Sequence, residues 1–270
     1  AVDPVGGRKD QSMIARAIRS KALAVLLPLA GPEAACEADG AQPVVVQDVT
    51  NLGDIRLADG RSVRLAGLHW PERARGRERE RLAAAVRAHV LHERVGLVVR
   101  ASADRWGRLP GDLFISRDGK PPLWLQGELA EDGMALAWPE AAGRACWRAL
   151  LERDTLGRLA RSGVWSALAR RPLHARLPAG QRVPISERVV YEGLVHSVRR
   201  GRAVTFVNFV GPRGTTPSWL IDRKLAGELQ RAGRDPATFA GKRLVLRANY
   251  RAEPRLTLRV SMPEAVDVIE

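Results

Sequence analysis

The chain is short of several features that assign a protein to a class directly. No run approaches about 20 uninterrupted apolar residues, so the sequence predicts no transmembrane helix. Cysteine occurs only twice, at Cys36 and Cys146, which leaves room for one disulfide at most. Two cysteines are the count expected of one disulfide in an oxidising compartment, and this bridge would stabilise the fold by about 4 kcal/mol in the entropic model. Two independent thiols are the alternative.

Acidic residues and lysine are also scarce. Asp and Glu number 30 against 44 Lys and Arg, which gives a net charge of +14, and only five of the basic residues are lysine. The positive excess predicts polyanions as partners, and arginine suits bidentate phosphate contact better than lysine does. An Ala- and Arg-rich composition also arises from GC-rich coding sequence without selection for binding, so composition leaves the partner open.

Length and apolar content are ample by comparison. A chain of 270 residues exceeds the usual size of one domain, and 45% hydrophobic residues can build real cores. We therefore expect a globular protein of about two domains.

The N-terminal segment predicts export. Residues 1–12 precede the first methionine, Met13, and we interpret them as translated upstream sequence. A basic stretch then leads into an apolar run at 22–30, which predicts a secretory signal peptide over residues 13–36. The product would be periplasmic or secreted. Lipidation at Cys36 is an alternative, although the apolar residue expected three positions earlier is absent.

The segment 42–166 has the pattern of one small barrel. Apolar alternation predicts strands at 44–49, 55–58 and 62–68, with Asp59-Gly60 as a hairpin turn. A helix is expected at 77–94, stopping before Gly96, followed by strands at 95–100 and 112–116. Helices at 123–132 and 140–162 complete the order. This α+β order, mainly β, is that of a five-stranded OB-type barrel with a helical cap.

The remaining chain repeats this order. Residues 167–186 are basic and proline-rich without an apolar period, which predicts a linker. The domain 187–270 then has three strands (189–198, 203–210, 218–221), a helix (223–232) and three further strands (242–250, 256–260, 265–269). We expect a second small OB-like barrel. It has no recognisable acid-base set, so we assign it binding or packing.

Two motifs carry the chemical signal, VRLAGLHWPE at 63–72 and DRWGR at 104–108. They place two arginines and one carboxylate, which suit the clamping of a phosphate and the orientation of an attacking water. Over residues 44–166 the chain resembles the thermonuclease family, also called staphylococcal-nuclease-like domains. The resemblance implies catalytic roles for three residues: Arg64 and Arg108 as the phosphate clamp and Glu72 as the general base. Otherwise Arg64 is a strand-face ion-pair former and Arg108 caps a turn.

The family's calcium site is not reproduced by these residues. The resemblance implies calcium as cofactor, held by two aspartates, but the matching positions here are Gly53 and His69. Weak substitutes are Asp54, if a bulge at 51–53 turns it toward the site, and Asp48. His69 suits zinc better than calcium, yet no second histidine stands at ligand spacing. The metal ligands are therefore unknown, and no cofactor is assigned.

Two tryptophans flank the arginines. Trp70 and Trp106 beside Arg64 and Arg108 predict a stacking surface for unpaired bases, although ordinary packing is the simpler role for either ring. The leading hypothesis is a secreted binding protein for single-stranded DNA or RNA, or for another phosphate-bearing polyanion. The alternatives are an active metal-dependent nuclease with a rebuilt site and a scaffold for a protein partner at the cell envelope.

Overall fold

The computed structural model describes residues 36–51, 53–70, 77–169, 187–212, 214, 216–251 and 256–269. Contacts divide the chain after Glu33, and residues 34–270 form one compact unit. The segments interpreted as upstream sequence (1–12) and signal peptide (13–36, apart from Cys36) lie outside the described residues, as does most of the predicted linker (167–186). Within the described part, no helix is both long and apolar enough to cross a bilayer.

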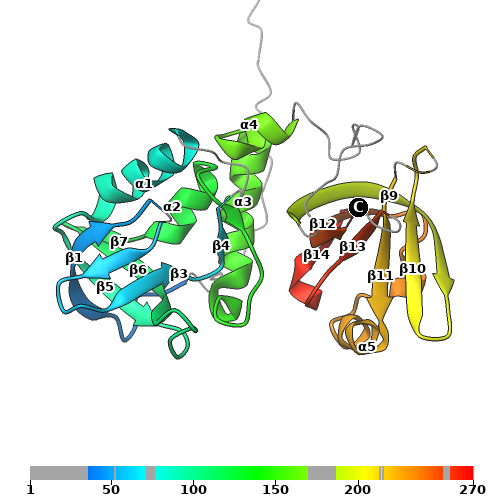
Figure 1. Ribbon diagram of the computed structural model, residues 1–270, viewed down its shortest axis with the longest axis horizontal. Helices are drawn as coiled ribbons and strands as arrows, with labels where there is room; N and C mark the ends of the chain where they lie inside the picture. The colour runs from blue at the N-terminus through cyan, green and yellow to red at the C-terminus, as the bar shows by residue number, and fades with distance from the viewer. Residues whose placement is uncertain are drawn as a thin grey trace, which may run out of the picture. The chain divides into compact units, whose positions relative to one another are not determined.

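The first sheet closes into a barrel. Its strand order is β3-β2-β1-β5-β6-β7, and an additional β3–β6 pairing joins the ends of the five-stranded set. The β3–β6 pairing is parallel, whereas the other pairings of this sheet are antiparallel. Figure 1 shows β1, β5 and β6 side by side. The strands are β1 (Gln42–Val49), β2 (Ile55–Leu57), β3 (Ser62–Leu65), β5 (Arg94–Val99), β6 (Arg108–Arg117) and β7 (Lys120–Trp124).

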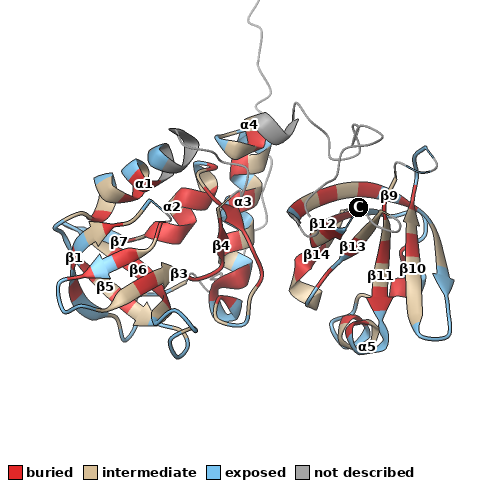
Figure 2. Cartoon of the chain, in the orientation of Figure 1, coloured by how far each residue is buried: buried red, intermediate tan, exposed pale blue. Residues whose placement is uncertain are grey.

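Helices pack against this barrel and contribute side chains to its core. In the sequence, helix α1 (Arg77–Val90) lies between the third and fourth barrel strands, β3 and β5, and it buries Val86 and Val90 in the core. Helix α2 (Leu125–Glu131) is largely buried, as Figure 2 shows, while α3 (Trp147–Ala160) buries Trp147 and Leu150. The smaller elements are β4 (Leu68–His69), β8 (Leu136–Ala137), η1 (Arg144–Cys146) and α4 (Val164–Ala169).

The second sheet has the same connectivity in its five barrel strands, whereas its sixth strand, β14, pairs with the fourth barrel strand and not with the fifth. Its order is β13-β11-β10-β9-β12-β14, closed by β13–β12 pairing, and β11–β13 is again parallel. A helix again separates the third and fourth strands. The elements are β9 (Glu187–Arg200), β10 (Val204–Phe209), β11 (Ser218–Asp222), α5 (Arg223–Arg231), η2 (Pro236–Thr238), β12 (Arg243–Arg251), β13 (Thr257–Arg259), η3 (Pro263–Ala265) and β14 (Val266–Ile269). The predicted α+β class, with an OB-type barrel followed by a second OB-like barrel, is confirmed.

Several predicted boundaries were wrong. Helix α1 ends at Val90, not at residue 94, because the chain turns at His92, which has a left-handed φ of 62°. Gly96 is therefore a residue of β5, paired with Phe114, and does not stop the helix. Strand β6 begins at Arg108, four residues earlier than predicted. Strand β7 (Lys120–Trp124) was not predicted, and its last two residues were assigned to the helix expected at 123–132, which begins at Leu125.

A buried ion pair joins the second sheet to the rest of the compact unit. Arg247 of β12 is 3% exposed, and its guanidinium bonds Asp154 of α3 at 2.5 Å and Asp267 of β14 at 2.8 Å. Its Nε also donates to the carbonyl of Ala137 at 2.9 Å. Burial raises the pKa of the Asp154 carboxyl, although Arg247 opposes this shift. Removing either partner would leave an uncompensated buried charge.

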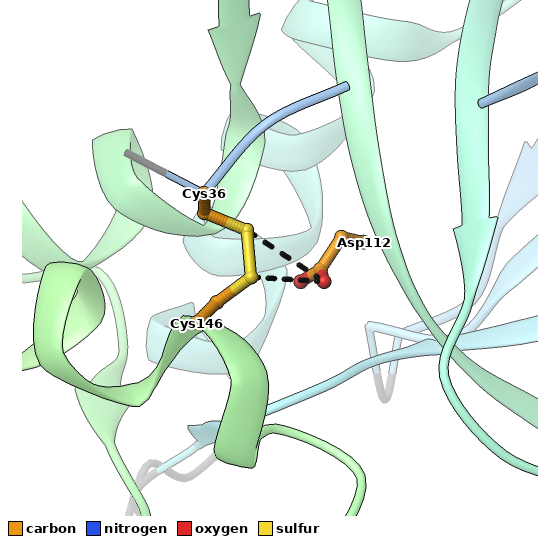
Figure 3. Close-up of side chains that lie close together, drawn as sticks. All are labelled: Cys36, Asp112 and Cys146. Carbon is orange, nitrogen blue, oxygen red and sulfur yellow. Dashed lines mark hydrogen bonds between the residues drawn. A yellow bond between two sulfur atoms is a disulfide. The ribbon is translucent and has the colours of Figure 1, made fainter. Parts of the chain in front are cut away.

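The disulfide between Cys36 and Cys146 is present, which confirms the predicted pairing. It ties the start of the described chain to η1 across 110 residues. Figure 3 shows both sulfur atoms beside the carboxylate of Asp112, at 3.9 and 3.5 Å from its Oδ2 atom. The bridge therefore packs against a buried charge.

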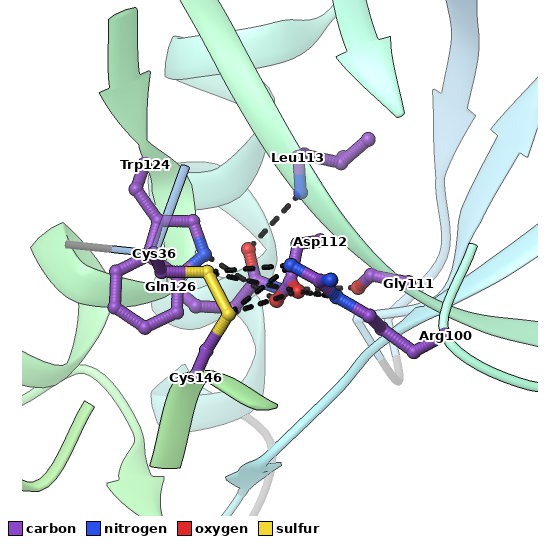
Figure 4. The surroundings of a disulfide bond; sticks show 8 residues. All are labelled: Cys36, Arg100, Gly111, Asp112, Leu113, Trp124, Gln126 and Cys146. Carbon is purple, nitrogen blue, oxygen red and sulfur yellow. Dashed lines mark hydrogen bonds and ion pairs between the residues drawn. A yellow bond between two sulfur atoms is a disulfide. The ribbon is translucent and has the colours of Figure 1, made fainter. Parts of the chain in front are cut away.

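That carboxylate is held by a polar network inside the barrel wall. Asp112 is 1% exposed, and Figure 4 shows Arg100, Trp124 and Gln126 arranged around it. Arg100 donates its Nε hydrogen to Oδ2, and Gln126 donates to Oδ1 at 2.6 Å. Burial raises the pKa of Asp112, although Arg100 acts against it. Gln126 also bonds the backbone of Gly111 and Leu113, so the network fixes α2 to β6.

Loss of the disulfide should lower stability without abolishing the fold. The bridge restricts a long loop of the unfolded chain, so Cys36→Ser/Cys146→Ser should lower the free energy of unfolding by about 4 kcal/mol. Urea unfolding with and without dithiothreitol measures this. Dithiothreitol should destabilise the wild type and leave the double variant unchanged. Equal unfolding midpoints for all four samples would contradict the prediction.

Candidate functional site

The two arginines of the predicted clamp lie on one face of adjacent strands. Parallel pairing sets Ser62 of β3 opposite Arg108 of β6, and Arg64 opposite Pro110. Val63 and Leu65 are buried, so Ser62 and Arg64 point to the opposite, outer side of β3. Arg108 shares that side because registered neighbours in a sheet point the same way. The fold thus brings Arg64 and Arg108 together.

Each guanidinium is already engaged by carboxylates. The Nη1 atom of Arg64 lies 2.8 Å from Oε1 of Glu140, and this oxygen also accepts the backbone N–H of Gly67 at 2.8 Å. Both side chains of the ion pair are about a quarter exposed. A phosphate group approaching Arg64 must compete with Glu140.

Arg108 lies between two aspartates. Its Nη1 atom is 3.1 Å from Oδ1 of Asp54, and its Nη2 atom is 2.9 Å from Oδ2 of Asp104. Burial disfavours the charged guanidinium, but the bonds to Asp104 and Asp54 outweigh it and raise the pKa of Arg108. Burial acts against the charged Asp104 as well, yet Arg108 and two backbone N–H groups lower the pKa of Asp104. Asp104 and Arg108 are therefore both charged at neutral pH.

An exposed tryptophan projects beside this ion-pair cluster. Trp106, in the loop between β5 and β6, is 63% exposed. The guanidinium carbon of Arg105 lies 3.9 Å from its ring centroid, and that of Arg108 lies 4.8 Å from it. Asp104 holds the loop by accepting the backbone N–H groups of Trp106 and Arg108. The loop is a fixed turn that presents an aromatic ring and cations to solvent.

At Gly53, the first position where the resemblance implies a metal-binding aspartate, the indole of Trp70 fills the space. Gly53 has a φ of +80°, and a Cβ built on it would lie 2.8 Å from Cε2 of the Trp70 indole. An aspartate at this position would require both a strained backbone and displacement of Trp70. Its neighbour Asp54 faces Arg108, where it serves as an ion-pair partner. The structure thus places Trp70 inside the site, half-buried against the β1–β2 turn.

His69, the second position where the resemblance implies a metal-binding aspartate, faces the guanidinium of Arg188. His69 is 6% exposed, and its Nδ1 atom lies 3.1 Å from Nη1 of Arg188, the second residue of β9. Arginine only donates, so Nδ1 accepts and the neutral imidazole carries its hydrogen on Nε2. Burial, together with the charge of Arg188, lowers the pKa of His69 to about 4. The imidazole also lies 5.2 Å from the ring of Trp138.

The remaining weak candidate is oriented elsewhere. Asp48 pairs with Arg56 across β1 and β2, and its Oδ1 accepts the backbone N–H of Val49 at 2.7 Å. Strand β1 has a register shift against β2 between Val46 and Asp48. The structure does not bring Asp48, Asp54 and His69 together.

Only one group of potential ligand atoms gathers among the residues that the structure describes. It consists of Cys36, Asp112 and Cys146, whose ligand atoms lie within 4.8 Å of one another. Both sulfur atoms are used in the disulfide of Figure 3, so neither is a thiolate that could bind a metal ion.

The sequence did not indicate two of the side-chain contacts in this site. Glu140 follows Trp138-Pro139, far along the chain, and no motif links it to Arg64. Arg105 lies within the DRWGR motif, but its stacking on Trp106 depends on the conformation of the turn. Glu72, predicted as the general base, lies outside the described residues.

Comparisons with known proteins give one distant structural similarity to report. No protein-family model matches this chain, and no curated protein matches it. Among solved structures, it is similar to the extended Tudor domain of Drosophila melanogaster Tudor-SN (p100), with 20% identity and a TM-score of 0.33. The match covers 39% of this chain and 47% of that chain, so this chain spans about half the length of the solved one.

The buried His69 should make stability depend on pH. Its pKa in the folded protein, about 4, is below the ordinary 6.5, so the unfolded chain binds a proton that the folded chain does not. This contribution is complete above pH 6.5 and is lost as the pH falls toward 4. The loss should be about 3 kcal/mol. Urea unfolding at several pH values measures it.

The matched control is His69→Gln, which can still accept from Arg188 but does not titrate. Carboxylates titrate in both proteins, so the difference between their two pH profiles isolates His69. Identical slopes between pH 6.5 and 4 would show that the imidazole is protonated normally in the folded state.

Proposed function

We propose that this protein binds single-stranded nucleic acid and does not cleave it. The observation that carries the proposal is the exposed Trp106 ring, stacked with Arg105 and adjacent to Arg108. A base can stack on such a ring with a gain of roughly 1–3 kcal/mol, and a guanidinium beside it can contact the flanking phosphate.

The charges around the site support binding through the loop more than through the two clamp residues. Arg64 and Arg108 are neutralised by Glu140, Asp54 and Asp104. Arg105 is exposed and has no carboxylate partner within the described part of the chain. A phosphate can therefore approach Arg105 without displacing an internal ion pair. We assign Arg105 and Trp106 the first contact, with Arg64 and Arg108 behind them.

Metal-dependent hydrolysis has little support from the residues at the expected ligand positions. Gly53 offers no side-chain oxygen, and the indole of Trp70 fills the space beside it. His69 faces Arg188, whose positive charge opposes a bound cation. A metal Lewis acid stabilises a transition state by several kcal/mol, and each 1.4 kcal/mol is about tenfold in rate. Without it, two paired guanidiniums support binding but little turnover.

One observation favours a second candidate function. Asp54 lies next to Arg108, so a carboxylate does reach the centre of the site. Together with Glu72 it would allow a rebuilt metal-dependent nuclease, the activity implied by the thermonuclease resemblance. We place this hypothesis second because Asp54 already bonds Arg108 through both oxygens.

The cellular setting is part of the proposal. The Cys36–Cys146 disulfide supports an oxidising compartment, and the sequence from Met13 supports export to the periplasm or the exterior. Nucleic acid, or another phosphate-bearing polymer met outside the cytoplasm, would be the partner.

Binding should depend on the exposed ring and its arginine. Trp106→Ala should weaken the binding of a fluorescein-labelled oligothymidylate roughly tenfold, because a stacked base is lost. Arg105→Gln should weaken it less and reduce the salt dependence by about one phosphate contact. Fluorescence anisotropy at several salt concentrations measures both effects.

Arg94→Gln is the matched control, because it removes the same charge from the other end of β5. It should leave the affinity nearly unchanged. If Arg94→Gln weakens binding as much as Arg105→Gln and Trp106→Ala has no effect, binding follows net charge and the assigned site is wrong. A wild type that binds no oligonucleotide at low salt would overturn the proposed function itself.

No cleavage is expected under any metal condition. Labelled single-stranded DNA incubated with the protein should remain intact with calcium, with magnesium and with chelator. The assay includes Glu72→Gln, because calcium-dependent cutting that this variant loses would establish the nuclease hypothesis and refute ours.

A further inference from the structure

The second barrel presents an outer sheet face with its own distinct chemistry. In β10, Val207 and Phe209 are buried in the core, so Phe206 and Asn208 point to the outer side. In β11, Trp219 and Ile221 are buried, so Ser218 and Leu220 point outward as well. Figure 1 shows β10 and β11 side by side.

Pairing extends this face across four strands. Phe206 is registered with Arg199 of β9 on one side and with Leu220 of β11 on the other. Ser218 is registered with Thr257 of β13, two residues before Arg259, and Leu258 between them is buried. Arg259 therefore emerges beside Leu220. The outer row consists of Arg199, Phe206, Leu220 and Arg259.

A hydrogen-bonded ladder lies next to this row. The side chain of Asn208 donates to Ser197 Oγ at 3.2 Å, and Ser218 Oγ donates to Asn208 Oδ1 at 2.9 Å. The ladder links β9, β10 and β11 through side chains on the outer face. It fixes the surface around Phe206 and offers small polar groups that can bond a base edge or a sugar.

The arginines of this face are not neutralised internally. Arg199, Arg200, Arg202 and Arg259 are exposed, and none of them pairs with a carboxylate within the described residues. The guanidinium of Arg199 lies over the Phe206 ring, 5.4 Å from its centroid. This contrasts with the first barrel, where the two clamp arginines are both held by acids.

The face is also separate from the surface that contacts the first barrel. Within the part of the chain described, the polar contacts from the second barrel to residues 36–169 come from Arg188, Glu192, Arg247 and Glu264. These belong to the first half of β9, to β12 and to η3. Phe206 and its row take no part in them.

We propose that this outer face of β9, β10, β11 and β13 is a second binding site for single-stranded nucleic acid. A base stacks on Phe206 against the apolar Leu220, and Arg199 and Arg259 contact the phosphates on either side. Strands two and three of an OB-type barrel are a usual oligonucleotide surface, and β10 and β11 have these positions here. The site goes beyond the proposed function, because its residues are independent of Arg105 and Trp106.

The test is a titration of the full chain with short oligothymidylate and oligouridylate, about 8 nucleotides each, by isothermal calorimetry. Two sites predict a stoichiometry of two for the wild type. Phe206→Ala should weaken one of the two sites roughly tenfold. Arg199→Gln/Arg259→Gln should weaken the same site and lower its salt slope by about 0.7 for each lost contact.

Two further variants separate stacking from structure. Phe206→Trp retains an aromatic ring and should preserve the site, whereas Phe206→Leu retains apolar bulk and should lose it. Arg231→Gln on α5 removes one exposed charge elsewhere on the second barrel and should have no effect. Thermal unfolding of each variant confirms that the barrel is intact, as expected for side chains opposite the core.

The outcomes distinguish this proposal from the proposed function. One site that is lost in Phe206→Ala and unaffected by Trp106→Ala supports the second face and refutes the first. One site that is lost in Trp106→Ala and unaffected by every Phe206 and arginine variant overturns the second face and leaves the first in place. Unequal affinities for the two oligonucleotides show whether the second face prefers DNA or RNA.

Discussion

The parallel pairing of the third barrel strand with the fifth is the constraint on which both barrels depend. It closes the five-stranded barrel in each sheet, and it joins segments that are far apart in sequence. In the first barrel it sets Ser62 beside Arg108, so that two arginines share one outer face. In the second it sets Ser218 beside Thr257, which brings Arg259 next to Leu220. The proposed second face and the position of Arg108 behind the first surface both depend on this pairing.

Arginine has three different roles in this protein, and its partners decide which one applies. Arg247 is buried between two carboxylates and a carbonyl, where it holds elements together. Arg64 and Arg108 are about a quarter exposed and paired, so a ligand must compete with internal acids. Arg105 and Arg199 are exposed beside aromatic rings and are available to an incoming polyanion. Net charge alone does not separate these cases.

An indole and a guanidinium lie at the two positions where the resemblance implies metal-binding aspartates. Trp70 lies against Gly53, and Arg188 lies against His69. Each replacement is compatible with its surroundings, since the ring fills space that glycine leaves and the neutral imidazole accepts a bond from arginine. Both positions at which the resemblance implies a metal-binding aspartate are therefore compatible with a well-packed barrel without a metal ligand.

The sequence by itself determined the OB-type order of strands and helices in both halves, because apolar alternation and turn residues act locally. It left the two cysteines either paired or separate, and the structure shows them paired. Strand ends, the extra strand β7 and the turn at His92 did not follow from the sequence, because pairing partners settle them. Only the tertiary structure decided that Glu140 meets Arg64 and that Arg188 faces His69. Such contacts depend on barrel closure and packing, which bring together residues whose spacing in sequence carries no signal.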